Sequence, residues 1–131
     1  MKINEFKQVL QDLKKRKIPE EVKKTVEILL DKKAEKVTVL KLIGISQMTD
    51  YIVICQVNSN RQNKAVADSI REDLRREFRL KPFGMEGEQK ADWILVDYVD
   101  FIVNIFLPEI RERFAIEKLW MDAKRYDFYP S

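Results

Sequence analysis

Three aspartates, a run of side-chain amides and a single cysteine are the residues of this sequence whose types and spacing could support chemistry. Asp50, Asp97 and Asp100 each adjoin an apolar run. Carboxylates on sheet strands can hold the Mg²⁺ that nucleotidyl transfer uses. However, no Gly-Ser pair precedes a D-x-D pattern, and no phosphate-binding glycine loop occurs. A metal-dependent nucleotidyltransferase-like enzyme therefore stays an alternative only, and we expect neither a metal site nor a cofactor.

Histidine is absent from the sequence, and cysteine occurs once, at Cys55. The absence of histidine excludes Ser-His-Asp and Cys-His catalysis and every zinc site that needs a histidine ligand. Cys55 lies inside the apolar run Tyr51–Cys55, where a thiol is usually a small buried hydrophobic group rather than a nucleophile. The sequence therefore offers neither histidine-dependent catalysis nor an expected cysteine nucleophile.

The expected location is the cytoplasm. A lone cysteine cannot form an intrachain disulfide, which is typical of a reducing compartment. No apolar run approaches the length of a membrane span, and the N-terminus lacks the apolar core of a signal peptide. Glu5 and Asp12 in the first amphipathic segment argue against a transit peptide.

The polar segment Asn58–Lys64 follows an apolar run and precedes an amphipathic one. Its amides could hydrogen-bond a nucleotide or an RNA backbone. Alternatively, Asn58, Ser59 and Asn60 cap the N-terminus of the helix that follows. Both interpretations remain open at this point.

Hydrophobic periodicity predicts an α/β protein of the α+β type, with a mixed sheet of about four strands and helices packed mainly on one face. Helices are expected over 3–16, 19–33 and 62–78 and from Pro108 onward, and strands over 36–42, 50–57 and two segments of 93–106, with a short extended piece at 82–85. We divide the chain into an N-terminal helical extension (1–18), one α/β domain (19–123) and a C-terminal tail (124–131). The tail shows no clear periodicity and is expected to be poorly ordered.

The block Trp93–Phe106 is predicted to form a hairpin that turns at Val99 and Asp100. Residues 97 and 102, 95 and 104, and 93 and 106 then face one another, and alternation separates two faces. The almost wholly apolar face, which belongs under the helices, holds Ile94, Val96, Tyr98, Phe101, Val103 and Ile105. The other face holds Trp93, Leu95, Asp97, Ile102, Asn104 and Phe106.

A carboxylate, an amide and large aromatic rings on that second face suggest that no second layer closes it. An apolar surface with aromatic anchors and a few polar groups is typical of a protein-binding site. Alternatively, the face is solvated and a C-terminal helix half covers its tryptophan. Both interpretations remain open.

Charge is distributed unevenly along the chain. Residues 1–41 carry 12 basic and 7 acidic side chains, although the whole chain has a net charge of only +3. A basic N-terminal third could lie against ribosomal or other RNA phosphate, or its lysines could form an ordinary solvated helix face.

Several short motifs, taken in order, resemble the ribosomal silencing factor (Iojap-related) family over about 22–123. The residues that carry the resemblance are Thr49-Asp50-Tyr51, Asn58-Ser59, Arg61-Gln62, Ala65, Ala67-Asp68, Glu86-Gly87, Trp93, Asp97, Asp100, Arg111, Glu117, Leu119-Trp120 and Asp122-Ala123. No single motif is decisive, but their order and spacing are specific.

The resemblance implies a nucleotidyltransferase-like fold without catalytic equipment, and hence a binding protein rather than an enzyme. It also implies binding to large-subunit ribosomal protein fourteen at the intersubunit face, which blocks joining of the two subunits and represses translation. A role in large-subunit assembly is the alternative that organelle relatives suggest. A monomer is expected on the ribosome, with a homodimer of the free protein left open.

This sequence departs from the family pattern at four positions. Lys41 stands where the family usually has Asp, Val57 where it has Gly, Asn104 where it has His, and Ala115 where it usually has Tyr. Asn104 keeps a hydrogen-bonding group without a titration, and Val57 is expected to straighten the turn after its strand. These departures leave the expected fold and partner unchanged but alter the fine geometry expected of the interface. The helix over 3–16 precedes the usual start of the family's domain, and its role is open.

Overall fold

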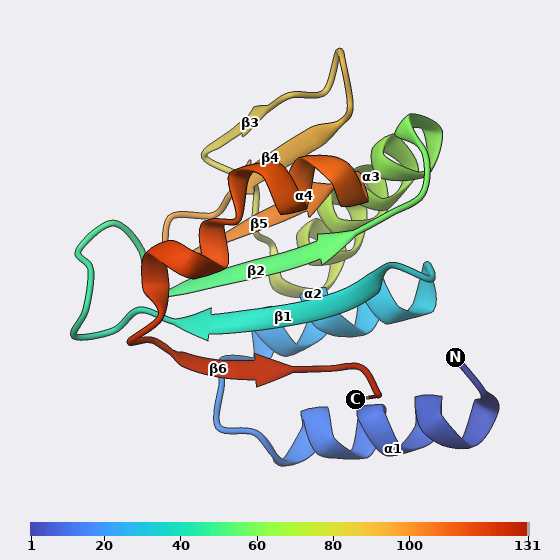
Figure 1. Ribbon diagram of the computed structural model, residues 1–131, viewed down its shortest axis with the longest axis vertical. Coiled ribbons are helices and arrows are strands. Elements are labelled where there is room, and N and C mark those ends of the chain that lie inside the picture. The colour runs from blue at the N-terminus through green and yellow to red at the C-terminus, as the bar shows by residue number, and fades with distance from the viewer. Residues whose placement is uncertain (131) are drawn as a thin grey trace.

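The computed structural model describes residues 1–130, which form a six-stranded mixed sheet between two helical layers (Figure 1). The sheet order is β3-β4-β5-β2-β1-β6. The helices are α1 (Ile3–Lys15), α2 (Glu20–Asp31), α3 (Asn60–Phe78) and α4 (Pro108–Phe114), followed by the 3₁₀ helix η1 (Ile116–Trp120). The strands are β1 (Glu35–Lys41), β2 (Tyr51–Gln56), β3 (Gly84–Glu86), β4 (Trp93–Asp97), β5 (Phe101–Phe106) and β6 (Lys124–Asp127). The α/β class and the mixed sheet are confirmed.

The central strands of the sheet combine parallel and antiparallel pairing. β2 runs parallel to β5, while β1 pairs antiparallel with β2 and β4 pairs antiparallel with β5. The β1–β2 loop and the β4–β5 turn therefore lie at the same end of the sheet. Every residue of β5 and all but the last residue of β2 are buried, as expected for strands covered on both faces.

The two edge strands explain why the sheet has six strands rather than about four. β3 is three residues long and pairs with β4. β6 pairs with β1, so that Tyr126 lies opposite Val39, and the expectation of a poorly ordered tail is wrong for 124–127. Backbone pairing and burial of Tyr126 and Phe128 order this segment, although its short, charged sequence has no strand period of its own.

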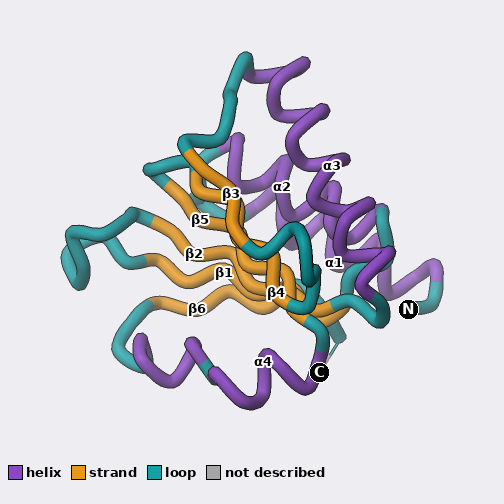
Figure 2. Tube along the Cα trace, turned by 90° about the horizontal axis from the view of Figure 1, so that it is seen from above, coloured by secondary structure: helices purple, strands orange, loops and turns teal. Residues whose placement is uncertain are grey.

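Helices α2 and α3 cover one face of the sheet, and α4 lies against the other (Figure 2), while α1 contacts α2 and lies beyond the β6 edge (Figure 1). The core on the α1–α3 side joins the apolar face of the hairpin to buried residues of α2 and α3, such as Val26, Leu29 and Ile70. The prediction that the apolar hairpin face lies beneath helices is confirmed. The N-terminal helix α1 contributes less to this core: its single buried residue is Leu13, and Phe6, Val9 and Leu10 are partly buried.

A second, smaller core lies on the opposite face. It consists of Leu40, Leu42, Ile52, Ile54, Phe106 and Ala123, with Trp93, Ile110, Ile116 and Trp120 packed against it. The segment from α4 to η1 thus forms a partial second layer. Pro108 opens α4 at its first turn, where a missing N–H costs little.

No helix within residues 1–130 combines the length and the apolar composition that crossing a bilayer would require.

Candidate partner-binding face

The β4–β5 hairpin has the register that alternation predicted. Trp93 lies opposite Phe106, Leu95 opposite Asn104 and Asp97 opposite Ile102. The six residues Trp93, Leu95, Asp97, Ile102, Asn104 and Phe106 therefore share one face of the sheet, which we call the hairpin face. Whether this face binds a partner stays a prediction.

Trp93 is held in one orientation within the hairpin face. Its Nε1–H donates to Oδ1 of Asn104 at 3.0 Å. Its ring centroid lies 4.8 Å from that of Phe106 and 5.0 Å from that of Phe114. Both neighbouring rings are tilted, which is a favourable arrangement for aromatic pairs. A large apolar ring is thus presented with little remaining side-chain freedom.

The hairpin face divides into a buried floor and a half-buried rim. Phe106 is fully buried, Asn104 is 3 % exposed and Ile102 is 9 % exposed. Trp93, Leu95 and Asp97 are half-buried. The expectation that no second layer closes this face is therefore wrong for Asn104 and Phe106, because α4 and Trp93 cover them. Only Trp93, Leu95 and Asp97 offer substantial surface to a partner.

The tight turn of the hairpin is fixed by side-chain and backbone hydrogen bonds. The Val99 N–H donates to Oδ1 of Asp97 at 2.8 Å, and Val99 has a left-handed φ of +72°. The Val99 carbonyl accepts from Oγ1 of Thr49 at 2.8 Å, and the Asp100 carbonyl accepts from the N–H groups of Asp50 and Tyr51. Asp97 thus has a structural role in the turn while keeping a half-buried, negatively charged carboxylate on the hairpin face.

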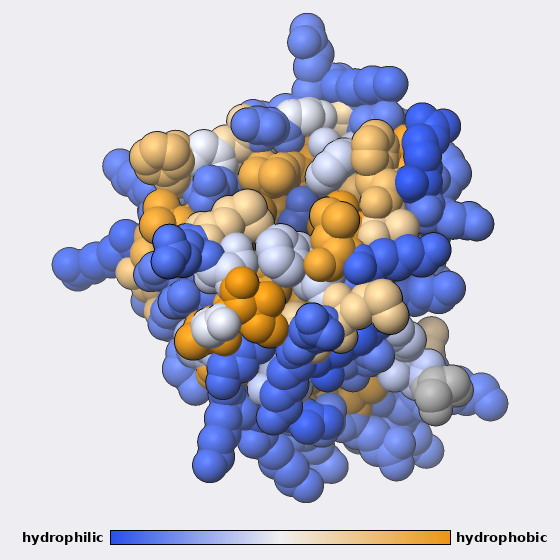
Figure 3. Space-filling model, turned by 60° about the vertical axis from the view of Figure 1, so that its left-hand side comes forward, coloured by the Kyte–Doolittle hydropathy of each residue, from blue (hydrophilic) through white to orange (hydrophobic). Residues whose placement is uncertain are grey.

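Exposed hydrophobic residues gather at the end of the sheet that carries this turn. Val99 is 56 % exposed in the turn itself, Met48 is 57 % exposed in the β1–β2 loop, and Leu119 is 72 % exposed in η1. At the opposite end of the hairpin, Phe114 is 50 % exposed, and its ring is tilted against that of Trp93. Figure 3 brings this side of the molecule forward and shows apolar side chains interrupted by polar ones. This mixture is typical of a protein-binding surface.

The polar segment Asn58–Lys64 forms the capped start of α3, which confirms one of the two interpretations. The Gln62 N–H donates to Oγ of Ser59, and the Asn58 N–H donates to Oε1 of Gln62. Asn63 is fully buried and donates through Nδ2 to the carbonyls of Ala91 and Ile105. The Asn63 amide therefore attaches α3 to β5 and to the loop before β4, whereas Asn58 and Asn60 are exposed at the start of the helix.

The remaining candidates for chemistry are not gathered into a site. Within residues 1–130, no group of three or more Asp, Glu, Cys or His side chains is arranged to hold a metal ion, so Asp50, Asp97 and Asp100 do not form one. Cys55 is fully buried, as predicted, and burial raises the pKa of its thiol to about 12. A protonated, inaccessible thiol is a poor nucleophile.

Arg111 is a buried cation whose role sequence reasoning missed. It is 8 % exposed, and its Nε donates to Oε1 of Glu117 at 2.8 Å. Its Nη1 donates to the carbonyl of Lys36 at 2.7 Å. Arg111 therefore ties α4 and η1 to the start of β1, which holds the second layer over the hairpin face. The sequence held one indication of this role, because Arg111 and Glu117 are both among the residues that carry the family resemblance.

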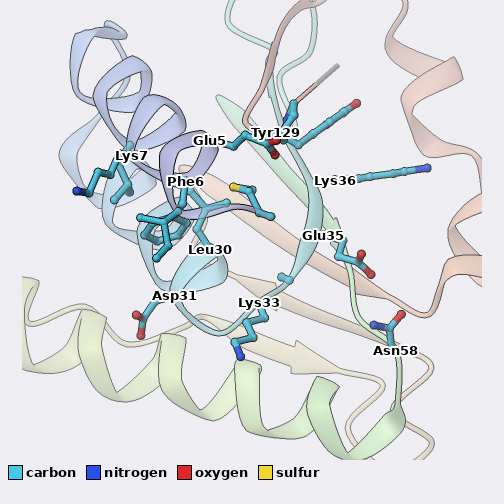
Figure 4. A pocket seen from close by; sticks show the side chains of 15 residues that line it. Glu5, Phe6, Lys7, Leu30, Asp31, Lys33, Glu35, Lys36, Asn58 and Tyr129 are labelled. Carbon is cyan, nitrogen blue, oxygen red and sulfur yellow. The ribbon is translucent and has the colours of Figure 1, made fainter.

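A separate hollow of about 1020 Å³ lies between α1, the α2–β1 connection and the C-terminal end of the described chain. Phe6 and Leu30 contribute apolar surface to it, while charged residues such as Lys36 surround it (Figure 4). It shares no lining residue with the hairpin face.

Comparison with known proteins assigns the chain to a family. A family model described as "Ribosomal silencing factor during starvation" matches residues 15–130. This chain belongs to the ribosomal silencing factor family. The ribosomal silencing factor RsfS of Bacillus subtilis is 40 % identical over 97 residues, which cover 74 % of this chain and 81 % of that relative.

Two further proteins are similar to this chain, one by its solved structure and one by its sequence. A crystal structure of a Chromobacterium violaceum protein aligns with a TM-score of 0.75 and 30 % identity, covering 88 % of this chain and 95 % of that one. The mouse protein named "Mitochondrial assembly of ribosomal large subunit protein 1" is 30 % identical over 97 residues, covering 72 % of this chain and 42 % of that relative.

The family model begins at residue 15, so most of α1 precedes it.

The family departures have specific structural settings. Asn104 accepts the Trp93 indole N–H. Val57 is fully buried, and its N–H donates to the Phe106 carbonyl at 2.8 Å. Its φ is not positive, so this position has no conformational need for glycine. Ala115 ends α4 in the left-handed region, with φ of +42°.

Proposed function

We propose that this protein binds large-subunit ribosomal protein fourteen at the intersubunit face, and that the bound protein blocks joining of the small and large subunits and so represses translation. The contact surface in this proposal is the hairpin face. Trp93, Leu95 and Asp97 touch the partner, while Ile102, Asn104 and Phe106 support them from below. Membership in the ribosomal silencing factor family supports the proposal.

The main reason to propose the hairpin face as the contact surface is that the Trp93 ring is held in a fixed orientation. Interface hot spots are enriched in tryptophan and contribute most when the ring is held in place before binding. The hydrogen bond to Asn104 and the contacts with Phe106 and Phe114 provide that arrangement. Neighbouring Leu95 and exposed Phe114 continue the apolar surface.

Charge supports a basic partner for this surface. Asp97 keeps one carboxylate oxygen free of the turn hydrogen bonds described above. Burying an unpaired carboxylate in an interface would cost several kcal/mol. Ribosomal proteins are generally basic because they lie on RNA, so a Lys or Arg of protein fourteen meets Asp97 in the complex.

A role in assembly of the large subunit is a second candidate function. The mouse relative carries that role in its name. Both roles use the same contact with the large subunit and differ in whether the bound subunit is mature. The nucleotidyltransferase-like alternative has no support from the geometry, because the three aspartates do not gather.

A subunit-joining experiment tests the proposed function. Purified large subunits are incubated with the protein, small subunits are added, and the fraction joined is read on a sucrose gradient. We expect the protein to co-sediment with the large subunit and to reduce joining in proportion to its occupancy. Co-sedimentation with unchanged joining would favour the assembly role, and the absence of co-sedimentation would contradict both roles.

A further inference from the structure

The C-terminal end of α3 and the loop that follows it form a hollow lined largely by cations. Its volume is about 810 Å³, and its charged lining consists of Arg71, Arg75, Arg76, Lys81 and one carboxylate, Glu72. Figure 2 places this end of α3 at the top of the view, on the side of the sheet opposite α4, where the chain returns to β3.

Two of the four cations are already paired. Arg76 lies 2.8 Å from Asp73, and Arg71 lies 3.9 Å from Glu88. Arg75 and Lys81 are exposed and have no carboxylate within 4.0 Å among residues 1–130. The hollow therefore keeps two cations that are available to an anionic ligand.

The hollow and the hairpin face meet at the same edge strand. On the helix side, Nη1 of Arg71 contacts Sδ of Met85 in β3 at 3.3 Å. On the other side of the sheet, Leu95 and Asp97 pair with Glu86 and Gly84 of the same strand. β3 is the outermost strand of the sheet, so one large partner that covers this edge would contact both surfaces.

We propose that this arginine hollow binds the phosphate backbone of ribosomal RNA when the hairpin face is seated on the large subunit. This inference rests on the proposed function and adds a second contact to it. Guanidinium groups match phosphate geometry and are common in RNA contacts. A basic ribosomal protein would be repelled by the same cations, so RNA is the occupant that the charge favours.

The lysine-rich N-terminal helices are the other basic region of the chain and provide the comparison for the hollow. Several cations of those helices are already in ion pairs, including Arg16 with Asp12 and Lys24 with Glu77. The exposed lysines Lys14 and Lys15 at the end of α1 provide a matched comparison, because reversing both charges changes the net charge equally.

The test compares two double variants, Arg75→Glu with Lys81→Glu, and Lys14→Glu with Lys15→Glu. Affinity for purified large subunits is measured between 50 and 200 mM salt, and affinity for isolated protein fourteen is measured in parallel. The affinity falls with salt, and each lost phosphate contact reduces the steepness of log affinity against log salt by about 0.7 to 0.9. We expect the first variant to bind large subunits about tenfold or more weakly and to reduce that steepness by about 1.5, with unchanged affinity for isolated protein fourteen.

The second variant is expected to change large-subunit affinity less than twofold. Equal losses in both variants would show a general charge effect and overturn the inference, as would unchanged binding by the first variant. In either case the proposed function stands if wild-type protein binds isolated protein fourteen. Salt-sensitive subunit binding that depends on Arg75 and Lys81, without affinity for protein fourteen, would support the hollow and refute the proposed partner. Thermal unfolding of each variant checks that its fold is intact.

Discussion

The indole N–H of Trp93 donates to the side-chain oxygen of Asn104 across the β4–β5 pair, at 3.0 Å. Asn104 is almost completely buried, whereas Trp93 is half-buried. The buried residue therefore fixes the orientation of the accessible one. This relationship connects the sheet register to the surface that we propose to bind the ribosome.

Replacing Asn104 with leucine should weaken both the fold and the proposed contact. The substitution leaves the indole N–H without its partner, which costs about 1–3 kcal/mol for a buried donor. Chemical denaturation measures this loss, and co-sedimentation measures binding. The double variant Asn104→Leu with Trp93→Phe, which removes the donor as well as the acceptor, is the control and should recover part of the lost stability. Unchanged large-subunit affinity in a stably folded Asn104→Leu protein would contradict the orienting role.

Asp97→Asn should separate the charge of this residue from its role in the turn. An asparagine oxygen can still accept from the Val99 N–H, so the free energy of unfolding should change by less than about 0.5 kcal/mol. Large-subunit binding should weaken because the negative charge is lost. Asp100→Asn, an exposed neighbour in the same turn, is the matched control. A large loss of stability with normal large-subunit binding would show that Asp97 is structural and that the partner binds outside the hairpin face.

Gly87→Ala should destabilise the hairpin strongly. Gly87 has φ of +84°, and a Cβ there would lie 1.9 Å from the Trp93 carbonyl oxygen. We expect a loss on the order of 2 kcal/mol or more in the free energy of unfolding. Gly84→Ala is the control, because a Cβ at Gly84 meets nothing within 4 Å, and it should be nearly neutral. Similar values for the two variants would be inconsistent with the packing of the loop before β4.

Arg111→Ala should release the layer formed by α4 and η1. The substitution leaves the Lys36 carbonyl and the Glu117 carboxylate without their partner, and breaking a buried ion pair costs about 3–5 kcal/mol. Arg113→Ala, an exposed change in the same helix, should stay within about 0.5 kcal/mol of wild type. Denaturant titration compares the two. Equal stability would show that α4 is held by its apolar contacts alone.

Tyr98→Phe tests a buried hydroxyl that lacks a hydrogen-bond partner among residues 1–130. Burial raises the pKa of Tyr98 to about 12. Above about pH 10 the unfolded tyrosine loses its proton while the folded one keeps it, so wild-type stability falls as the pH rises toward 12. The variant should be equally or more stable at pH 8 and should lose less stability between pH 8 and 11. Melting temperatures across this range measure both effects, and an identical alkaline loss in the two proteins would contradict the assignment.

The sequence predicted correctly those elements that depend on local patterns, such as alternation within a hairpin or a capping residue at a helix start. The hairpin register followed from alternation in Trp93–Phe106, and the cap of α3 followed from Ser59 and its neighbours. β6 was missed because a charged four-residue strand depends on pairing with β1, which is more than eighty residues away in sequence. The cover over Phe106 was predicted only as an alternative, in which a C-terminal helix half covers Trp93, and the contact of Phe114 in α4 with Trp93 supports that alternative. Periodicity could not place η1, because Ala115 ends α4 in the left-handed region.

The central claim is tested most directly by calorimetric titration of isolated ribosomal protein fourteen into this protein and into its Trp93→Ala variant. If Trp93 is the anchor, its removal should cost about 2 kcal/mol or more, which is about 30-fold in affinity. We predict saturable one-to-one binding by the wild-type protein and at least that loss in a folded variant. The absence of wild-type binding, or equal affinity of the two proteins, would contradict the account.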